Sequence, residues 1–161
     1  MRVLGIDPGL AASGYGVIEL NGRRESLAEA GVIRPAGRDL AARLCEIHAA
    51  IAEALRELRP DVMVIEEVYS KYRHPRTAIL MAHARGVICL AAGDAALPLV
   101  HYAASEVRRA LTGNGSASGR QIKEMVCRRL GISAASGDDH VWDALALALC
   151  HAGRLREGAT R

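Results

Sequence analysis

Two acidic residues of this chain each follow a short apolar run that is typical of a buried strand. Asp7 follows Val3–Ile6 and precedes a Pro-Gly pair that ends the segment, and Glu66 follows Val62–Ile65. A carboxylate beside a hydrophobic core is costly unless it is paired or binds a cation. These two side chains are therefore candidates for a site at the ends of two strands.

A further candidate pair comes from the last predicted helix, over residues 137–155. His140 and Asp143 are three residues apart and so share one helix face. Hard ions such as Mg²⁺ take a few carboxylate oxygens and keep water and phosphate in their other positions. Two such ions, roughly 3.5–4 Å apart, support phosphodiester hydrolysis. We therefore expect Asp7, Glu66, His140 and Asp143 to form a catalytic site for two Mg²⁺ ions, although Asp at a helix start is also a common cap.

The elements that must position these residues follow from the spacing of apolar side chains. Strands ending at Asp7, over 15–20 and over 23–33, with a turn at Asn21-Gly22, form an antiparallel meander. A helix over 38–59 then leads to a strand over 61–68, which a right-handed crossover places parallel to the first strand. A short edge strand over 98–102 completes an α/β fold, a five-stranded mixed sheet flanked by helices. The carboxyl edge of such a sheet is where ligands bind.

Composition indicates one globular domain with an aliphatic core. The chain has 161 residues, half of them hydrophobic, with no Phe and a net charge of +3. We expect a single domain over residues 1–155 and a frayed tail over 156–161. Four Cys without a C-x-x-C pair, no membrane-spanning run and a first strand at the N-terminus predict buried free thiols and a cytoplasmic protein without a signal peptide.

Two basic regions could contact nucleic acid. The loop over 69–76 holds Tyr69, Lys71, Arg73 and Arg76, which favours phosphate contacts and stacking of a base on tyrosine over a plainly solvated loop. The second is a Gly/Ser turn over 112–119, before a helix that a Ser118–Gln121 capping box opens. Helix N-termini bind anions, and the residues predicted to contact DNA here are Arg108, Arg109, Ser116, Arg120 and Lys123. An ordinary loop between helices is the alternative.

The helix predicted over Thr77–Ala92 is apolar almost all round. A helix without a polar face must be covered on every side. In a chain of this size the second cover is best supplied by another copy of the helix. We therefore expect a homodimer through this helix, with a purely internal core helix as the alternative.

Several separate motifs make the chain resemble RuvC-type Holliday junction resolvases of the ribonuclease-H-like superfamily over residues 1–155. They occur in the expected order and are G-I-D-P-G (5–9), G-Y-G-V-I (14–18), V-I-E-E-V-Y (64–69), A-R-G-V (84–87), Y-A-A-x-x-V-R (102–108), G-N-G-S-A (113–117) with Gln121, and D-A-L-A-L-A (143–148). The resemblance implies a ribonuclease-H-like sheet and a dimeric endonuclease that nicks opposed strands of four-way junction DNA symmetrically, in recombination and repair.

The same resemblance assigns roles to individual residues. Asp7, Glu66 and Asp143 match the family's metal-binding acids, and Tyr69 matches an aromatic residue that stacks on DNA near the crossover. It also implies branch-migration motors of the RuvA and RuvB type as partners. Competing hypotheses are a non-catalytic junction-binding module, another ribonuclease-H-like nuclease, and an actin-like ATPase, for which this chain lacks the second domain.

Two positions depart from the family pattern. His140 stands where many members have Asp, which predicts loss of activity below about pH 6.5 and good use of Mn²⁺, since Mn²⁺ accepts imidazole more readily than Mg²⁺. Gly119 stands where a lysine is expected, and Arg120 or Lys123 would have to replace it. Glu67 should point to the opposite sheet face from Glu66 because side chains alternate along a strand.

Overall fold

The computed structural model describes residues 1–67, 75–133 and 138–159 and is built on one mixed five-stranded sheet. The strands are β1 (Arg2–Asp7), β2 (Ser13–Asn21), β3 (Arg24–Ile33), β4 (Val62–Glu66) and β5 (Leu99–Tyr102), in the spatial order β3-β2-β1-β4-β5. The pairs β1–β2 and β2–β3 are antiparallel, whereas β4 is parallel to β1 and β5 is parallel to β4. The predicted meander with two parallel additions is confirmed.

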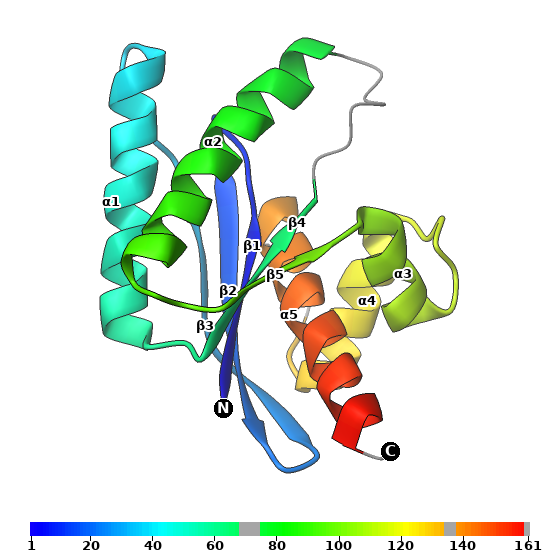
Figure 1. Ribbon diagram of the computed structural model, residues 1–161. Coiled ribbons are helices and arrows are strands. Elements are labelled where there is room, and N and C mark those ends of the chain that lie inside the picture. The colour runs from blue at the N-terminus through cyan, green and yellow to red at the C-terminus, as the bar shows by residue number, and fades with distance from the viewer. Residues whose placement is uncertain (68–74, 134–137, 160–161) are drawn as a thin grey trace.

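Helices cover both faces of this sheet (Figure 1). On one face lie α1 (Leu40–Leu58) and α2 (Pro75–Asp94). On the other face α5 (Asp139–Ala159) runs along the sheet, with α3 (Ala104–Thr112) and α4 (Gly119–Leu130) packed against it. Strand alternation divides the core accordingly, because Leu4 and Ile6 face α1 and α2 whereas Val3 faces α5.

Local signals explain where these helices begin and end. The side chain of Asp39 accepts a hydrogen bond from the amide of Ala42 and so caps α1. The predicted Ser118–Gln121 capping box at the start of α4 is present, and both of its hydrogen bonds form. Gly113 and Gly131 end α3 and α4 in the left-handed conformation that glycine adopts without strain.

Three details differ from the sequence expectations. β4 ends at Glu66 rather than at residue 68. α5 continues to Ala159, and Arg156 pairs with the side chain of Glu25, so residues 156–159 are a helical end rather than a frayed tail. All four thiols are free, as expected, but Cys45 is exposed. In the described ranges, no helix is both long and apolar enough to cross a bilayer.

Candidate active site

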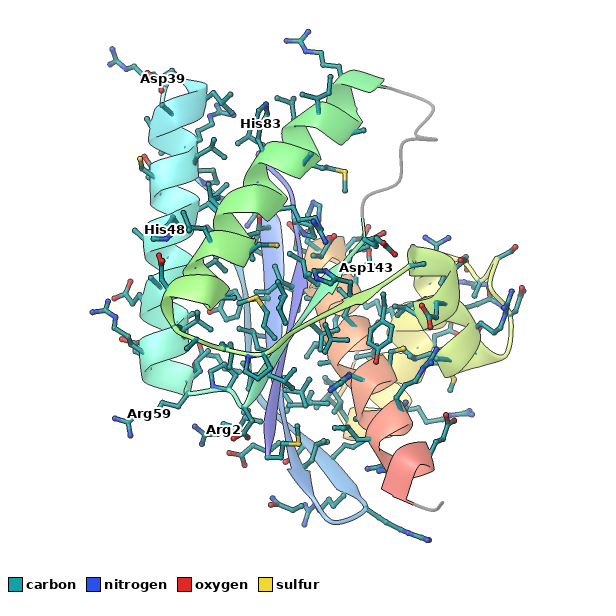
Figure 2. All side chains as sticks on the ribbon, in the orientation of Figure 1. Arg2, Asp39, His48, Arg59, His83 and Asp143 are labelled. Carbon is teal, nitrogen blue, oxygen red and sulfur yellow. The ribbon has the colours of Figure 1, made fainter. Side chains whose placement is uncertain are left out.

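Strand pairing brings the two predicted strand-end acids side by side. β1 and β4 run parallel with Ile6 opposite Ile65, so Asp7 and Glu66 leave the sheet next to each other at its carboxyl edge. Side chains alternate along a strand, and Val3 of β1 and Val64 of β4 pack on the α5 side of the sheet. Asp7 and Glu66, an even number of residues further along these strands, therefore point toward α5 as well. Asp143 lies on α5 beside the end of β4 (Figure 2). The four predicted residues, including His140 at the start of α5, are therefore brought together.

Glycines on β1 and β2 let α5 approach the sheet closely enough to bring His140 and Asp143 beside the strand-end acids. A Cβ atom on Gly5 would lie 1.9 Å from the carbonyl oxygen of Ala144, and one on Gly14 would lie 2.0 Å from the carbonyl oxygen of His140. On Gly16 it would meet the Leu145 side chain at 2.5 Å. Gly5 pairs with Gly16 across β1 and β2, and Gly14 pairs with Asp7. This glycine seat, Gly5, Gly14 and Gly16, sets the backbone of α5 directly over the strands.

Asp7 and His140 form the closest contact in the site. Asp7 is only 6% exposed, and its Oδ2 lies 2.6 Å from Nδ1 of His140. This hydrogen bond raises the pKa of His140 above its usual value, although burial acts in the opposite direction. In the metal-free protein, His140 therefore becomes protonated at a higher pH than an ordinary histidine as the pH falls.

A capping interaction fixes the end of α5 that carries His140. The amide of His140 donates to Oδ1 of Asp138 at 3.0 Å. Arg34, which follows β3, pairs with the other carboxylate oxygen of Asp138. Acids at a helix start are common caps, as expected from the sequence, whereas the pairing of Arg34 with Asp138 depends on tertiary packing that residue spacing does not predict.

Crowding of acids shifts the other two carboxyl groups. Burial first, and then the charges of Asp7 and Asp143, raise the pKa of Glu66 to about 7. Burial and the charge of Asp7 raise the pKa of Asp143 to about 6. Asp143 nevertheless keeps an exposed surface, so solvent screens its charge more than that of Glu66. Carboxyl groups whose pKa values are raised by burial and by one another indicate a place where a cation would be stabilised.

Arg108 of α3 is a cation whose charge acts on both of these carboxyl groups. It lines a small cavity together with Glu66 and Asp143, and its charge lowers the pKa of both carboxyl groups. From its sequence context, Arg108 is predicted only to bind DNA. Its position beside the acids arises from the packing of α3 against α5, which residue spacing along the chain does not reveal.

The donor set fits hard divalent ions in type. Carboxylate oxygens and one imidazole nitrogen converge at a sheet edge, and the raised pKa values show that the site favours added positive charge. Among the described residues, however, no three His, Cys, Asp or Glu side chains are already arranged around a single point. The Asp7–His140 hydrogen bond accounts for part of this, because it turns both groups toward each other. Ion binding would require these side chains to reorient.

The predicted DNA contacts lie in different settings. Arg76, Arg109, Ser116 and Arg120 are exposed, and Arg120 lies 3.9 Å from Glu124. The ammonium group of Lys123 lies 4.8 Å from the centre of the ring of Trp142. Trp142 is on α5 and directly precedes Asp143, so Lys123 lies close to this part of the helix. The three predicted contacts Tyr69, Lys71 and Arg73 fall outside the described residues.

Two further titratable residues, Glu67 and His48, have contacts of their own. Glu67 is exposed, and its amide donates to the carbonyl oxygen of Tyr102 at 2.9 Å. His48 lies on α1, on the far side of the sheet, where its ring is 3.2 Å from Asp94 (Figure 2). His48 therefore lies apart from the acidic group.

Comparison with known proteins identifies relatives along nearly the whole chain. The family model described as crossover junction endodeoxyribonuclease RuvC matches residues 3–151. A crossover junction endodeoxyribonuclease RuvC of Rhodopirellula baltica is 46% identical over 149 residues, covering 92% of this chain and 84% of that protein.

Solved structures agree with this match. The Thermus thermophilus RuvC structure has a TM-score of 0.89 at 34% identity and covers 98% of this chain and 97% of its own. T. thermophilus RuvC in complex with Holliday junction substrate gives a TM-score of 0.87 at 32% identity, with the same coverage. The predicted ribonuclease-H-like fold is thereby confirmed, and the chain belongs to the RuvC family of crossover junction endodeoxyribonucleases, the Holliday junction resolvases.

Proposed function

We propose that the protein resolves Holliday junctions by nicking two opposed strands symmetrically, with Asp7, Glu66, His140 and Asp143 as the residues that hold two divalent ions. The observation that carries this proposal is the meeting of these side chains from β1, β4 and α5 at one sheet edge. Structural acids would be expected to pair with cations, but here two of the carboxyl groups instead have strongly raised pKa values.

The metal ions are assigned by the chemistry of the donors. The family is metal-dependent, and we propose Mg²⁺ as the ion, with Mn²⁺ accepted because imidazole suits it better. When bound, such ions supply an activated water and stabilise the charge that develops on the scissile phosphate. Asp7 and Glu66 bind from the rigid strand ends, whereas His140 and Asp143 bind from α5. His140 must be neutral to act as a ligand or base.

Arg108 has a separate role in this proposal. Its guanidinium group lies beside Glu66 and Asp143, where it offsets part of their mutual repulsion and offers donors to a phosphate group. The exposed cations Arg76, Arg109 and Arg120, with Lys123 and Ser116, would hold the DNA backbone around the site. Tyr69, Lys71 and Arg73 complete the proposed contact surface.

A two-fold dimer would match a junction with two equivalent strands to cut. Support comes from α2, where Ile79 and Leu90 are 57% and 56% exposed on a helix with no strongly polar face. We therefore propose that α2 pairs with α2 of a second copy. Branch-migration motors of the RuvA and RuvB type as partners, and a cytoplasmic location, follow from the family resemblance.

The proposal is tested by cleavage of a synthetic four-way junction with Asp7→Asn. The variant keeps the size of the side chain but removes its charge, so several kcal/mol of transition-state stabilisation are lost and cleavage falls by at least about 100-fold. Junction binding without divalent ions should stay within about twofold of the wild type. Asp61→Asn, at the opposite end of β4, is the matched control and should cut normally.

The same assay separates the competing functions. A wild-type protein that binds the junction but never cuts it with Mg²⁺ or Mn²⁺ would be a binding module. Equal cleavage of duplex, flap and RNA–DNA hybrid substrates would indicate another nuclease of this superfamily. Normal cutting by Asp7→Asn would remove the metal assignment.

A further inference from the structure

Arg85 lies in the A-R-G-V motif of α2, which the proposed function leaves without a role. Its side chain crosses from the helix to the carboxyl edge of the sheet. Nε donates a hydrogen bond to the backbone carbonyl oxygen of Glu66 at 3.1 Å, and Nη2 donates to Nδ1 of His101 at 2.8 Å. Arg85 therefore contacts the peptide unit that carries one of the proposed metal-binding acids, and it does so from the opposite face of the sheet.

The sheet itself gives this end of β4 little support on one side. β5 holds the next residue, since the amide of Glu67 donates to the carbonyl oxygen of Tyr102 at 2.9 Å. β1 ends at Asp7, and the following Pro8 has no amide hydrogen, so β1 cannot extend the ladder beyond this point. The bond from Arg85 is thus made where the strand leaves the sheet and where the backbone direction decides the placement of the Glu66 carboxyl group.

The hydrogen bond to His101 also fixes the orientation of the Arg85 guanidinium group. His101 stands opposite Ile65 in the β4–β5 register, one residue before Glu66 along the strand. Arginine presents its donors in a rigid planar fork, so a bond to His101 orients the Nε–H group that reaches Glu66. The bond from Arg85 to Glu66 is partly buried, which limits competition from water for it.

We propose that Arg85 is a positioning residue that holds Glu66 in the orientation needed for divalent-ion binding and so ties α2 to the active site. The proposal rests on the metal-binding role proposed for Glu66. Ligands that are held from outside the first coordination layer bind metal more tightly, and loss of such support typically costs 10–100-fold in metal affinity or activity.

The test measures the affinity of the DNA-free protein for Mn²⁺ by titration calorimetry. Arg85→Gln should weaken Mn²⁺ binding by roughly 10-fold. Arg85→Lys should fall between this variant and the wild type, because lysine restores one donor but not the fork. Arg56→Gln is the matched control, since Arg56 donates a hydrogen bond to the carbonyl oxygen of Ala52 in its own helix, and this variant should bind Mn²⁺ normally.

A second variant guards against simple loss of folding. His101 is exposed, so His101→Ala should fold and keep its melting temperature while weakening Mn²⁺ binding by about fivefold through the lost brace. Junction binding without divalent ions should be unchanged for Arg85→Gln and His101→Ala. Melting temperatures measured without metal serve as the structural readout for every variant.

Two results would overturn the proposal. Wild-type Mn²⁺ affinity in Arg85→Gln would show that the contact does not position Glu66. A purely structural role would be shown if Arg85→Gln and Arg85→Lys lost Mn²⁺ affinity equally and also had much lower melting temperatures, while His101→Ala kept its Mn²⁺ affinity.

Glu66→Gln separates this proposal from the function on which it rests. If Glu66→Gln binds Mn²⁺ normally, the metal role of Glu66 fails, whereas weak binding there with normal binding in Arg85→Gln refutes the Arg85 proposal alone.

Discussion

The two faces of the sheet are packed by different means. On the face toward α1 and α2, bulky side chains such as Leu4, Ile6 and Met63 separate the helices from the strands and are fully buried. On the face toward α5, the strands present the glycine seat, and backbone approaches backbone. Side-chain layers can adjust to small changes of volume, whereas a backbone contact has no such freedom.

This difference explains where the proposed site can lie. A catalytic group needs to be held within about 0.5 Å of its working position. The backbone that carries His140 and Asp143 is fixed in this way, because α5 rests on strand backbones next to Asp7 and Asp138 caps the helix. Face-to-face packing through leucine and isoleucine would hold α5 less strictly. We infer that the face on which backbone approaches backbone is the one that can support chemistry.

The largest effect should come from adding one carbon atom to the α5 face. Gly14→Ala would place Cβ 2.0 Å from the carbonyl oxygen of His140, so α5 must move away from Asp7. A displacement of about 1 Å costs on the order of 100-fold in rate, and overpacking costs about 1–3 kcal/mol of stability. Single-turnover junction cleavage and chemical denaturation measure the two effects.

Two further glycines provide the controls for this variant. Gly153 is on α5, and an added Cβ atom there would have nothing within 4 Å. Gly153→Ala should therefore leave cleavage unchanged. Gly16→Ala meets the flexible Leu145 side chain instead of backbone and should show a smaller loss than Gly14→Ala. A wild-type cleavage rate in a folded Gly14→Ala protein would contradict the proposed importance of the seat.

The sequence revealed the chemical groups but not the contacts that position them. Asp7 and Glu66 were found because each ends an apolar run, and His140 and Asp143 because three residues separate them on a helix. Pairing of parallel strands then predicts convergence. The role of Gly14 was not found, since glycine alone predicts only turns, bulges or close approach.

Long-range partners account for the other differences. Arg85 and Glu66 meet across the sheet, and no periodicity connects a helix residue to a strand carbonyl oxygen. The end of α5 was placed too early for the same reason, because Arg156 is held by Glu25 on β3. Such ion pairs depend on tertiary packing, which single-sequence patterns do not record.

An intermediate effect is expected from removing a charge on the α5 face. Glu66 has an ordinary pKa of 4.5 when unfolded and a folded value of about 7, so the folded state binds the proton more tightly. The associated stability is complete below pH 4.5 and is lost as pH rises through 7. Glu66→Gln should therefore stabilise the metal-free protein at pH 8 by about 1–3 kcal/mol, with little effect at pH 4.

Denaturant unfolding at the two pH values measures this prediction. Glu53→Gln, an exposed acid on α1, is the control from the other side of the sheet and should change stability by less than about 0.5 kcal/mol. Mg²⁺ should stabilise the wild type at pH 8 but not Glu66→Gln, because ligand binding favours the folded state. If Glu66→Gln is destabilised at pH 8 without metal, the crowding of acids at this site is not the dominant effect.

The smallest effect should come from removing one carbon atom on the opposite face. Ile6→Val deletes a buried methylene group directly before Asp7 in sequence, and the expected cost is about 0.5–1.5 kcal/mol of unfolding free energy. Cleavage should stay within about twofold of the wild type, because Ile6 packs toward α1 and α2 and the neighbouring side chains can partly close the gap. The same denaturation and cleavage assays apply. A loss of cleavage comparable to that of Gly14→Ala would show that the two faces are mechanically coupled through β1, and that the position of Asp7 depends on both layers rather than on the glycine seat alone.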